Sequence, residues 1–528
     1  MTHRQILEAL SGLLLAMFVA MLSSTVVSNA LPRIVTDLQG TQSGYTWVVV
    51  ATLLAMTAST PLWGKLADLW DKKLLVQSAL VIYTVGSLIA ALAPSMGVLI
   101  GGRVVQGLGV GGLTALVQVV IAAMVPPRER GRYSGYIGAV FATATVSGPL
   151  LGGVVVDSPL GWRGCFFIGL PFALAAFVVL QRTLRIPVVR RETRIDYLGA
   201  TLLVGGVSLL LIWVSLAGSE FAWISATSAW LIGAGVVVLA AAILVEAKVA
   251  SDPIIPLRLF RDRTTALATG AAALVGVAMF GATVYLSQYF QLARGMSPTH
   301  AGLMSIAMVG GLLVSSLVSG RIITATGRWK RWLVGGLVLV VVGFVLLGTI
   351  DADTPLVRVA ASMVVVGLGL GAAMQNLVLA VQNAAPVADL GAASSAVAFF
   401  RSLGGSIGVS VLGAVLSHQV KDDVTTGGAQ LVAQGVTPPP ASDGATGSIP
   451  DLAALPTPWR DLYEHAFGSA TGHVFLLAVP FAILALVAVL FIRETPLRTT
   501  LGDAARGERV PPEAAAADAV GVPASAER

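Results

Sequence analysis

Long apolar runs recur along the whole chain, each separated from the next by a short polar stretch. Each run holds about 20 residues, which at 1.5 Å per residue suffices to cross roughly 30 Å of hydrocarbon. Because lipid offers no partner for free backbone polar groups, the runs are predicted to be helices. The fourteen runs lie at residues 7–30, 44–63, 74–93, 97–123, 133–156, 163–181, 197–217, 228–246, 265–292, 299–319, 332–350, 356–383, 391–417 and 467–492.

The composition supports this all-α membrane fold. Hydrophobic residues make up 56% of the chain and charged residues 11%, with a mean hydropathy of +0.85, which excludes a soluble globule with an ordinary charged surface. The sequence pI of about 9.6 does not indicate nucleic-acid binding, because the basic residues are spread over short loops instead of forming one patch. The single cysteine, Cys165, excludes a disulfide framework.

The lysines and arginines also predict the topology. With the N-terminus inside, 25 of the 33 fall in segments assigned to the cytoplasm and six in outer ones, which favours cytoplasmic location for both termini. The first run has no cleavage-site pattern and is interpreted as a retained span. Few lysines beside abundant Ala, Gly and Val point to a GC-rich bacterial genome, so the predicted location is the bacterial cytoplasmic membrane.

An internal repeat divides the chain. Residues 64–73 (GKLADLWDKK) follow the second run and residues 320–330 (GRIITATGRWK) follow the tenth; both place a glycine at a helix end and basic residues eight to ten positions on. We therefore expect two pseudo-symmetric six-helix halves with two helices inserted between them. The expected boundaries are 1–195, 196–263, 264–496 with an outer loop at 418–466, and a disordered cytoplasmic tail at 497–528.

Little regular structure is expected in the outer segment 418–466, which is rich in Gly, Pro, Thr and Ala. Only Trp459 to Phe467 has a pattern that allows a short interfacial helix.

Three motifs resemble those of a known family. Residues 64–73 match the inner-loop signature of the major facilitator superfamily, although Asp71 stands where its second glycine is usual. Residues 103–107 (RVVQG) match its Arg-x-x-Gln-Gly signature, and residues 148–153 (GPLLGG) match its exporter signature. Their order and spacing, together with the stretch 22–32 (LSSTVVSNALP), resemble the fourteen-span drug:proton antiporter branch.

The resemblance implies roles for these residues. Asp68 would close a contact between the halves that gates the pathway, and Arg103 with Gln106 would take part in proton coupling. Gly148, Pro149, Gly152 and Gly153 would form a kinked, tightly packed pivot. The alternatives are a solvated loop charge for Asp68, a structural arginine bonded to backbone carbonyls for Arg103, and the ordinary frequency of Gly and Pro in membrane helices.

One departure from the branch concerns proton coupling. Ser23 stands where the branch usually has Asp, and no Asp or Glu lies near the middle of any predicted span. Cation exporters commonly use a membrane-embedded carboxylate to attract the cation and to carry the proton. The absence argues against a strict preference for cations. Arg401 adds a second buried positive charge beside Arg103, so neutral or anionic amphiphiles are plausible substrates; a purely structural role is the alternative.

Uncharged polar residues mark predicted cavity faces, because amides and hydroxyls in lipid should turn inward. Four amides of the twelfth run recur at i, i+1, i+7 and i+8, where helix–helix contacts are the alternative role. The predicted substrate cavity comprises Ser23, Trp47, Gln118, Tyr285, Gln288, Tyr289, Gln375, Asn376 and Arg401.

The sequence predicts a secondary active exporter of amphiphilic drugs or antibiotics, working by alternating access in exchange for protons. It predicts a monomer in the lipid bilayer with a small amphiphilic substrate, protons as the coupled ion, and no nucleic acid, cofactor or metal. The first alternative is a lipid or metabolite translocator with loose or no proton coupling. A membrane enzyme would need acidic or metal-binding residues gathered at one face, and the sequence offers no such cluster.

Overall fold

The computed structural model describes residues 3–39, 42–156, 158–186, 196–218, 220–250, 252–437 and 455–499. Its long helices are α1 (His3–Asp37), α2 (Gln42–Leu69), α3 (Lys72–Ala91), α4 (Met96–Met124), α5 (Pro127–Val156), α7 (Gly169–Thr183), α8 (Tyr197–Leu216), α9 (Ala226–Lys248), α10 (Arg263–Gln288), α12 (Ile306–Thr326), α13 (Lys330–Leu347), α14 (Leu356–Ala384), α15 (Leu390–Ala433) and α16 (Thr457–Leu490). Short helical segments are η1 (Gly161–Arg163), α6 (Gly164–Phe167), η2 (Leu257–Arg261), η3 (Tyr289–Ala293), α11 (Pro298–Met304) and η4 (Val387–Asp389).

The predicted all-helical membrane fold is confirmed. Within the described residues, thirteen helical segments are long and apolar enough to cross a membrane, and each corresponds to a predicted run. The remaining run corresponds to α5, which has 30 residues but opens on the polar sequence PRERGR. Outside the isolated bridge between Ala217 and Phe221, the described chain has no strand pairing.

Local sequence sets several helix starts. Asp71, Asp196 and Asp262 each precede a helix, and each side chain accepts a hydrogen bond from a backbone N–H of the first turn. Such caps satisfy donors that have no partner inside the helix. At the other terminus of a helix, Gly327 ends α12 with a φ of 71°, in the left-handed region that favours glycine.

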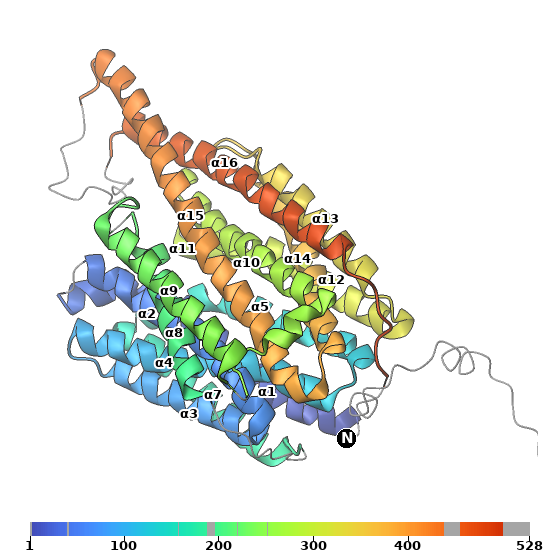
Figure 1. Ribbon diagram of the computed structural model, residues 1–528. Helices are drawn as coiled ribbons and strands as arrows, with labels where there is room; N and C mark the ends of the chain where they lie inside the picture. The colour runs from blue at the N-terminus through green and yellow to red at the C-terminus, as the bar shows by residue number, and fades with distance from the viewer. Residues whose placement is uncertain are drawn as a thin grey trace, which may run out of the picture.

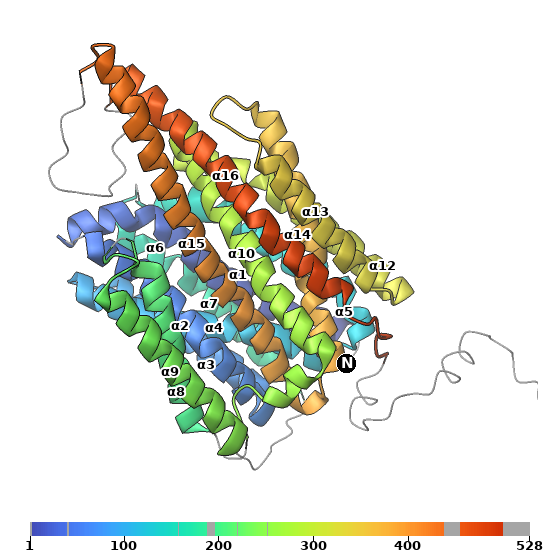
Figure 2. The same ribbon diagram turned by 45° about the horizontal axis from the view of Figure 1, so that its top comes forward.

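The helices form two halves that pack against each other in a reciprocal way (Figure 1, Figure 2). In the first half α4 packs on α2 and α3, and α1 packs on α5 and α7; in the second, α14 packs on α12 and α13, and α10 packs on α15 and α16. Between the halves, α2 packs on α15 and α5 packs on α12. The second helix of each half therefore meets the fifth helix of the other, as a two-fold relation requires.

The inserted helices α8 and α9 pack on each other and lie beside the junction of α2 with α15 (Figure 1). Val207 and Leu211 of α8 form a buried cluster with Ala58 of α2 and Phe399 of α15. The pair therefore touches both halves at one of the two junctions between them.

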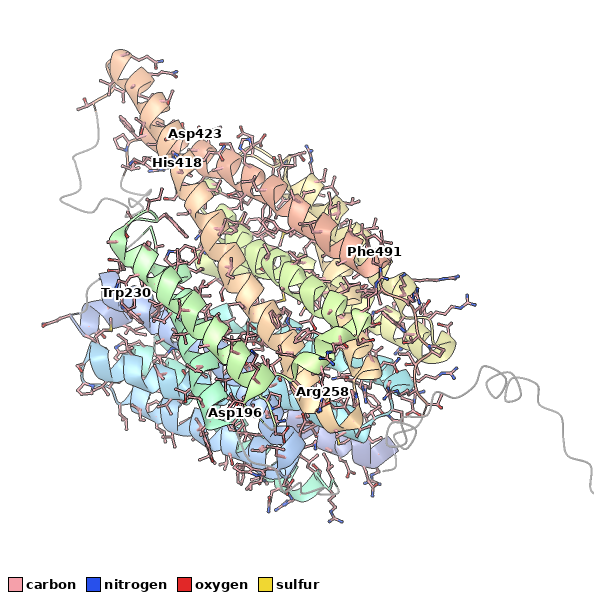
Figure 3. The ribbon with its side chains drawn as sticks, in the orientation of Figure 1. Asp196, Trp230, Arg258, His418, Asp423 and Phe491 are labelled. Carbon is pink, nitrogen blue, oxygen red and sulfur yellow. The ribbon has the colours of Figure 1, made fainter. Side chains whose placement is uncertain are left out.

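The segment expected to be an outer loop is largely helical where it is described. α15 continues through Ala433 and α16 starts at Thr457, so the expectation of loop structure at 418–433 was wrong (Figure 1). His418 and Asp423 lie on this projecting part of α15 (Figure 3). Here α15 and α16 pack along a seam. In it, Trp459 of α16 packs on Gly428 of α15, and its indole N–H donates to the Thr437 carbonyl at 3.0 Å.

This seam joins two segments far apart in sequence, which is why the apolar pattern of each one alone did not reveal it. The interfacial helix expected at Trp459–Phe467 is instead the first part of α16. Residues 438–454 of the outer segment and 500–528 of the expected tail lie outside the described residues.

Candidate functional site

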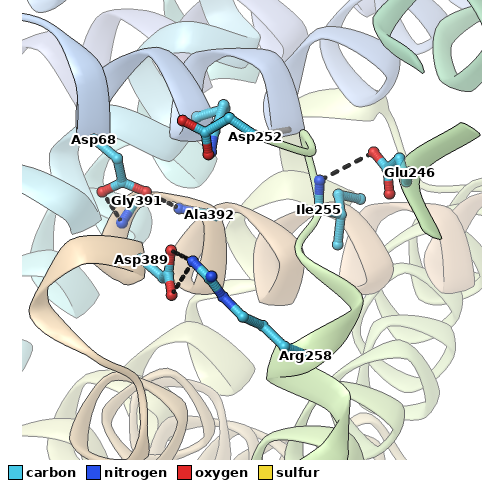
Figure 4. A network of polar contacts seen from close by, with 9 residues as sticks. Asp68, Glu246, Asp252, Ile255, Arg258, Asp389, Gly391 and Ala392 are labelled. Carbon is cyan, nitrogen blue, oxygen red and sulfur yellow. Dashed lines mark hydrogen bonds and ion pairs between the residues drawn. The ribbon is translucent and has the colours of Figure 1, made fainter. Parts of the chain in front are cut away.

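Asp68, at the last turn of α2, binds the start of α15 in the other half. Its Oδ1 accepts the backbone N–H of Gly391 at 2.7 Å and its Oδ2 accepts that of Ala392 at 2.8 Å (Figure 4). First-turn N–H groups have no partner within their own helix, and the positive end of the helix dipole favours a carboxylate. The N-cap residue of α15, Asp389, makes no side-chain cap bond, so Asp68 caps this helix from the opposite half.

A glycine next to Asp68 lets the two backbones approach. A Cβ placed on Gly64 would lie 2.6 Å from the Gly391 carbonyl oxygen, closer than any real Cβ contact. The repeat has the same feature, since a Cβ on Gly320 of α12 would collide with the Gly131 carbonyl of α5. The two glycines that defined the sequence repeat therefore occupy equivalent places at the two junctions. We call this end of the bundle the Asp68 end.

The second junction has a different polar contact. At the position four residues beyond Gly320, Thr324 replaces the carboxylate. Here the exposed Arg128 of α5 donates from Nε to the Thr324 carbonyl and from Nη2 to the Ala325 carbonyl, both at 3.4 Å. These bonds are longer and more exposed than those of Asp68, so they hold the junction less firmly.

The linker between α9 and α10 adds ion pairs to the junction of α2 with α15. Asp252 pairs with Lys65 of α2, whose side chain is almost fully buried. Arg258 donates to Asp389, just before α15, at 2.8 Å (Figure 4). Glu246 of α9 accepts the Ile255 backbone N–H at 3.1 Å and so fixes the linker to its own helix. The inserted helices are thereby tied to both halves.

A group of amides and one arginine also lies between the halves, near the start of α5 and the end of α14. Arg130 of α5 is 6% exposed and donates to the carbonyls of Val125 and Ala122 and, at 2.8 Å, to Gln382 Oε1 of α14. Gln382 Nε2 donates to the Ser394 hydroxyl of α15 at 2.9 Å. The Gln382 side chain thus connects α5 of the first half with α14 and α15 of the second half.

The predicted cavity residues Gln118 and Gln375 meet beside this group. Gln118 Nε2 of α4 lies 3.5 Å from Gln375 Oε1 of α14. The two glutamines, Arg130 and Gln382 line a cavity of about 20 Å³, roughly the space of one water molecule. The amide stripe predicted on α14 thus faces the other half at positions 375 and 382.

The two asparagines of that stripe face elsewhere. Asn376 donates to the Ala372 carbonyl of its own helix at 2.6 Å, and Asn383 binds Pro496 and Arg498 of the C-terminal segment. Trp47 and Gln288 are half-buried, whereas Tyr285 and Tyr289 are fully buried in the second half. The Tyr285 hydroxyl donates to the Val409 carbonyl and the Tyr289 hydroxyl to that of Asp351, so both serve internal contacts of this half.

Arg103 and Gln106 form a closed network inside the first half. Arg103 is 4% exposed; its Nη1 donates to Gln106 Oε1 at 2.5 Å and its Nε to the Val48 carbonyl at 3.3 Å. Gln106 Nε2 donates to the Ser87 hydroxyl at 2.7 Å. The guanidinium is therefore held by neutral oxygens of α2 and α4, as a buried cation requires.

Ser23 and Gly148 lie on the paired helices α1 and α5. Ser23 is buried and its hydroxyl has no hydrogen-bond partner within the described structure. Gly148 packs against the Thr25 side chain, where a Cβ would collide. Gly152 is buried, whereas the side chain of Pro149 and the surroundings of Gly153 lie outside the described residues.

Arg401 differs from Arg103 in its surroundings. It lies on α15 seven residues after Ser394 and hence near the same face. Its side chain is partly accessible, and within the described residues no hydrogen bond or ion pair holds its guanidinium. A cation at membrane depth without a hydrogen bond or an ion pair is energetically costly.

Sequence reasoning did not find Arg130, the Lys65–Asp252 pair or the Arg258–Asp389 pair. Each belongs to a loop or helix end where basic and acidic residues are common, and each partner is more than 100 positions away. No local spacing could have identified them. Gln382 was visible in the amide stripe, but its role as a link between helices depends on the fold.

Two related halves of membrane-length helices, joined at glycine junctions, define a membrane transporter by their architecture. The Major Facilitator Superfamily profile matches residues 13–409, and the chain belongs to this family. It is therefore a multi-pass membrane transporter and not an enzyme.

Curated relatives cover most of the chain. It is 35% identical over 498 residues to the uncharacterized MFS-type transporter Rv1877 of Mycobacterium tuberculosis, covering 94% of this chain and 70% of that protein. It is 34% identical to the efflux pump dotC of Dothistroma septosporum, covering 93% and 84%. It is 34% identical to the multidrug transporter protein MdtP of Bacillus subtilis, covering 77% and 75%.

Solved structures show the same fold at low identity. The human organic anion transporter MFSD10 has a TM-score of 0.57 and 14% identity, covering 90% of this chain and 99% of that one. The proton:xylose symporter XylE has a TM-score of 0.60 and 14% identity, covering 93% and 96%. At this identity the likeness concerns the fold alone.

Proposed function

We propose that this transporter exports amphiphilic drugs or antibiotics by alternating access, in exchange for protons. The observation that carries the proposal is the capping of α15 by Asp68 from the other half. It is a contact that opens and closes as a unit when the halves rock, because it joins them through one carboxylate. Relatives named efflux pump and multidrug transporter support the direction of transport.

We assign the Asp68 end to the cytoplasm on the bias of 25 basic residues to six. With this orientation, closure at Asp68 shuts the cytoplasmic entrance while substrate leaves on the outer side. Arg103 with Gln106 and Asp68 are the proposed coupling residues, and Gly148 against Thr25 is part of the proposed pivot. The protein acts as a monomer with one pathway between its own halves.

The proposed substrate pathway lies between the halves near Gln118, Gln375 and Arg401. Two glutamines offer both donors and acceptors, and Arg401 offers a positive charge. A pathway lined in this way, without a carboxylate at membrane depth, favours neutral and anionic amphiphiles over cations. Resistance profiles of cells expressing the chain, taken with compounds of all three charge classes, test this preference. A profile confined to lipophilic cations contradicts it.

The gate is tested in everted membrane vesicles that accumulate a fluorescent amphiphile under an imposed pH gradient. Asp68→Asn keeps the size of the side chain but removes its charge, and we expect the initial rate to fall at least about tenfold, since bonds to charged groups contribute about 1.5–3 kcal/mol each. Asp196→Asn is the matched control, because Asp196 also caps a helix, α8, without joining the halves. Equal rates in the two variants contradict the assignment of the gate.

A lipid or metabolite translocator with loose or no proton coupling is the second candidate. Ser23 favours it, because this buried hydroxyl without a partner stands where the antiporter branch usually has a carboxylate. The same vesicles separate the two functions. Accumulation that stops when the pH gradient is collapsed supports antiport, whereas accumulation that continues unchanged supports the translocator.

A further inference from the structure

A cavity of about 350 Å³ opens at the end of the bundle opposite Asp68, entirely within the first half. It is formed by the ends of α1 and α5 and by the segment that leads into η1. Charged and aromatic residues line it together, which distinguishes it from an ordinary packing gap. Its lining includes Arg33, Asp37, Leu160, Trp162 and Arg163.

Trp162 brings an unsatisfied donor to this cavity. Its side chain is 2% exposed, yet its indole N–H has no hydrogen-bond partner within the described structure. A buried N–H without an acceptor costs free energy comparable to a lost hydrogen bond. The ring packs edge to face on Phe166, with ring centroids 6.2 Å apart. The indole nitrogen itself has almost no exposed surface, so an acceptor in the cavity reaches it only when the ring shifts.

Arg163 is held in place beside this donor. Its guanidinium lies 4.3 Å from the centre of the Trp162 ring, and its Nη2 donates to the Ala93 carbonyl at 3.3 Å. These contacts leave the other guanidinium donors available, because the described residues provide no acceptor for them. Stacking on the ring already restricts the conformations of the Arg163 side chain, so the side chain loses less conformational entropy when it binds an oxyanion.

We propose that this cavity binds the phosphate of a phospholipid headgroup, with the Arg163 guanidinium and the Trp162 indole N–H as donors. Trp and Arg at the start of a membrane span stand at headgroup level. Leu160 lines the cavity yet is 64% exposed, and Val154 on the last turns of α5 is 72% exposed. These side chains give acyl chains an apolar surface beside the phosphate site, which a free anion does not need.

The test is native mass spectrometry of the purified full chain, titrated with phosphatidylglycerol. Diacylglycerol with the same acyl chains lacks the phosphate, and inorganic phosphate lacks the chains, so the two ligands separate the contributions. We expect phosphatidylglycerol to bind at least about tenfold more tightly than either. Equal binding of diacylglycerol, or saturation by inorganic phosphate at the same concentration, overturns the lipid assignment.

Two variants and one control assign the donors. Arg163→Gln should weaken phosphatidylglycerol binding about tenfold, and Trp162→Phe, which keeps a ring but removes the N–H, about threefold. Arg358→Gln is the control, since Arg358 is an exposed arginine at the same end of the second half and donates to Thr349. Unchanged affinity in Trp162→Phe and Arg163→Gln, or an equal loss in all three variants, contradicts the proposed site.

Discussion

The junction of α2 with α15 and that of α5 with α12 have the same backbone geometry but different polar contacts. In both, a glycine at the end of one helix touches a glycine carbonyl at the start of the other. Asp68 then closes the first junction with two short bonds to backbone N–H groups, whereas Arg128 closes the second with two bonds of 3.4 Å to carbonyls. The two junctions therefore share their backbone packing and differ in their polar contacts.

The difference indicates that the two junctions have different roles in the motion. A carboxylate at the positive end of a helix is sensitive to its own charge, because protonation removes most of its attraction for the N–H groups. An exposed arginine keeps its charge at any physiological pH and exchanges its bonds readily for water. The α2–α15 junction is thus suited to switch, and the α5–α12 junction to guide the motion.

Removing the carboxylate should have the largest effect. In an Asp68→Asn variant we expect the Asp68 end to open, because the cap of α15 loses its charge. Ser395 is fully buried beneath Gly64, so a Ser395→Cys reporter in a Cys165→Ser background measures the opening by its rate of maleimide labelling. The rate should rise at least about tenfold. An unchanged labelling rate contradicts the switching role.

Adding one methyl group to the second junction should have the next largest effect. Gly320→Ala places a Cβ against the Gly131 carbonyl, and overpacking of this kind costs about 1–3 kcal/mol. We expect about tenfold slower transport in everted vesicles. Gly335→Ala in α13 is the control, because a Cβ there meets nothing within 4 Å. Similar rates in both variants would mean that close approach at this junction is not needed.

The two junctions also show what the sequence could reveal. Gly64 and Gly320 were identified from a repeated spacing, and Asp68 from the resemblance of residues 64–73 to the inner-loop signature of the family. Both signals are local in the sequence, because the residues that end a helix lie close together in the chain. The sequence also shows Thr324 at the position that corresponds to Asp68 in the first half. It does not show that Arg128 binds there, because Arg128 belongs to a distant helix. The sequence did not reveal that Arg130 is buried, for the same reason. The local sequence around a basic residue next to a loop is the same whether its side chain faces water or binds a distant residue such as Gln382.

The ion pairs of the α9–α10 linker should have a smaller effect. Arg258→Gln leaves the buried Asp389 without its guanidinium next to the start of α15, although the exposure of Arg258 weakens the pair. We expect labelling of Ser395→Cys to become about threefold faster. Arg261→Gln, in the same short helix, serves as the control. A change as large as that of Asp68→Asn would make the linker, not the carboxylate, the main lock.

Arg128→Gln should have the smallest effect and is the sharpest test of the comparison. Its two bonds are long and exposed, and exposed contacts of this kind contribute about 0–1 kcal/mol, so transport should change less than about threefold. The neighbouring exposed Arg132→Gln controls for the loss of one positive charge at this end. If Arg128→Gln instead slows transport as much as Asp68→Asn, both junctions act as switches. The unequal chemistry of the two repeats would then have no functional consequence.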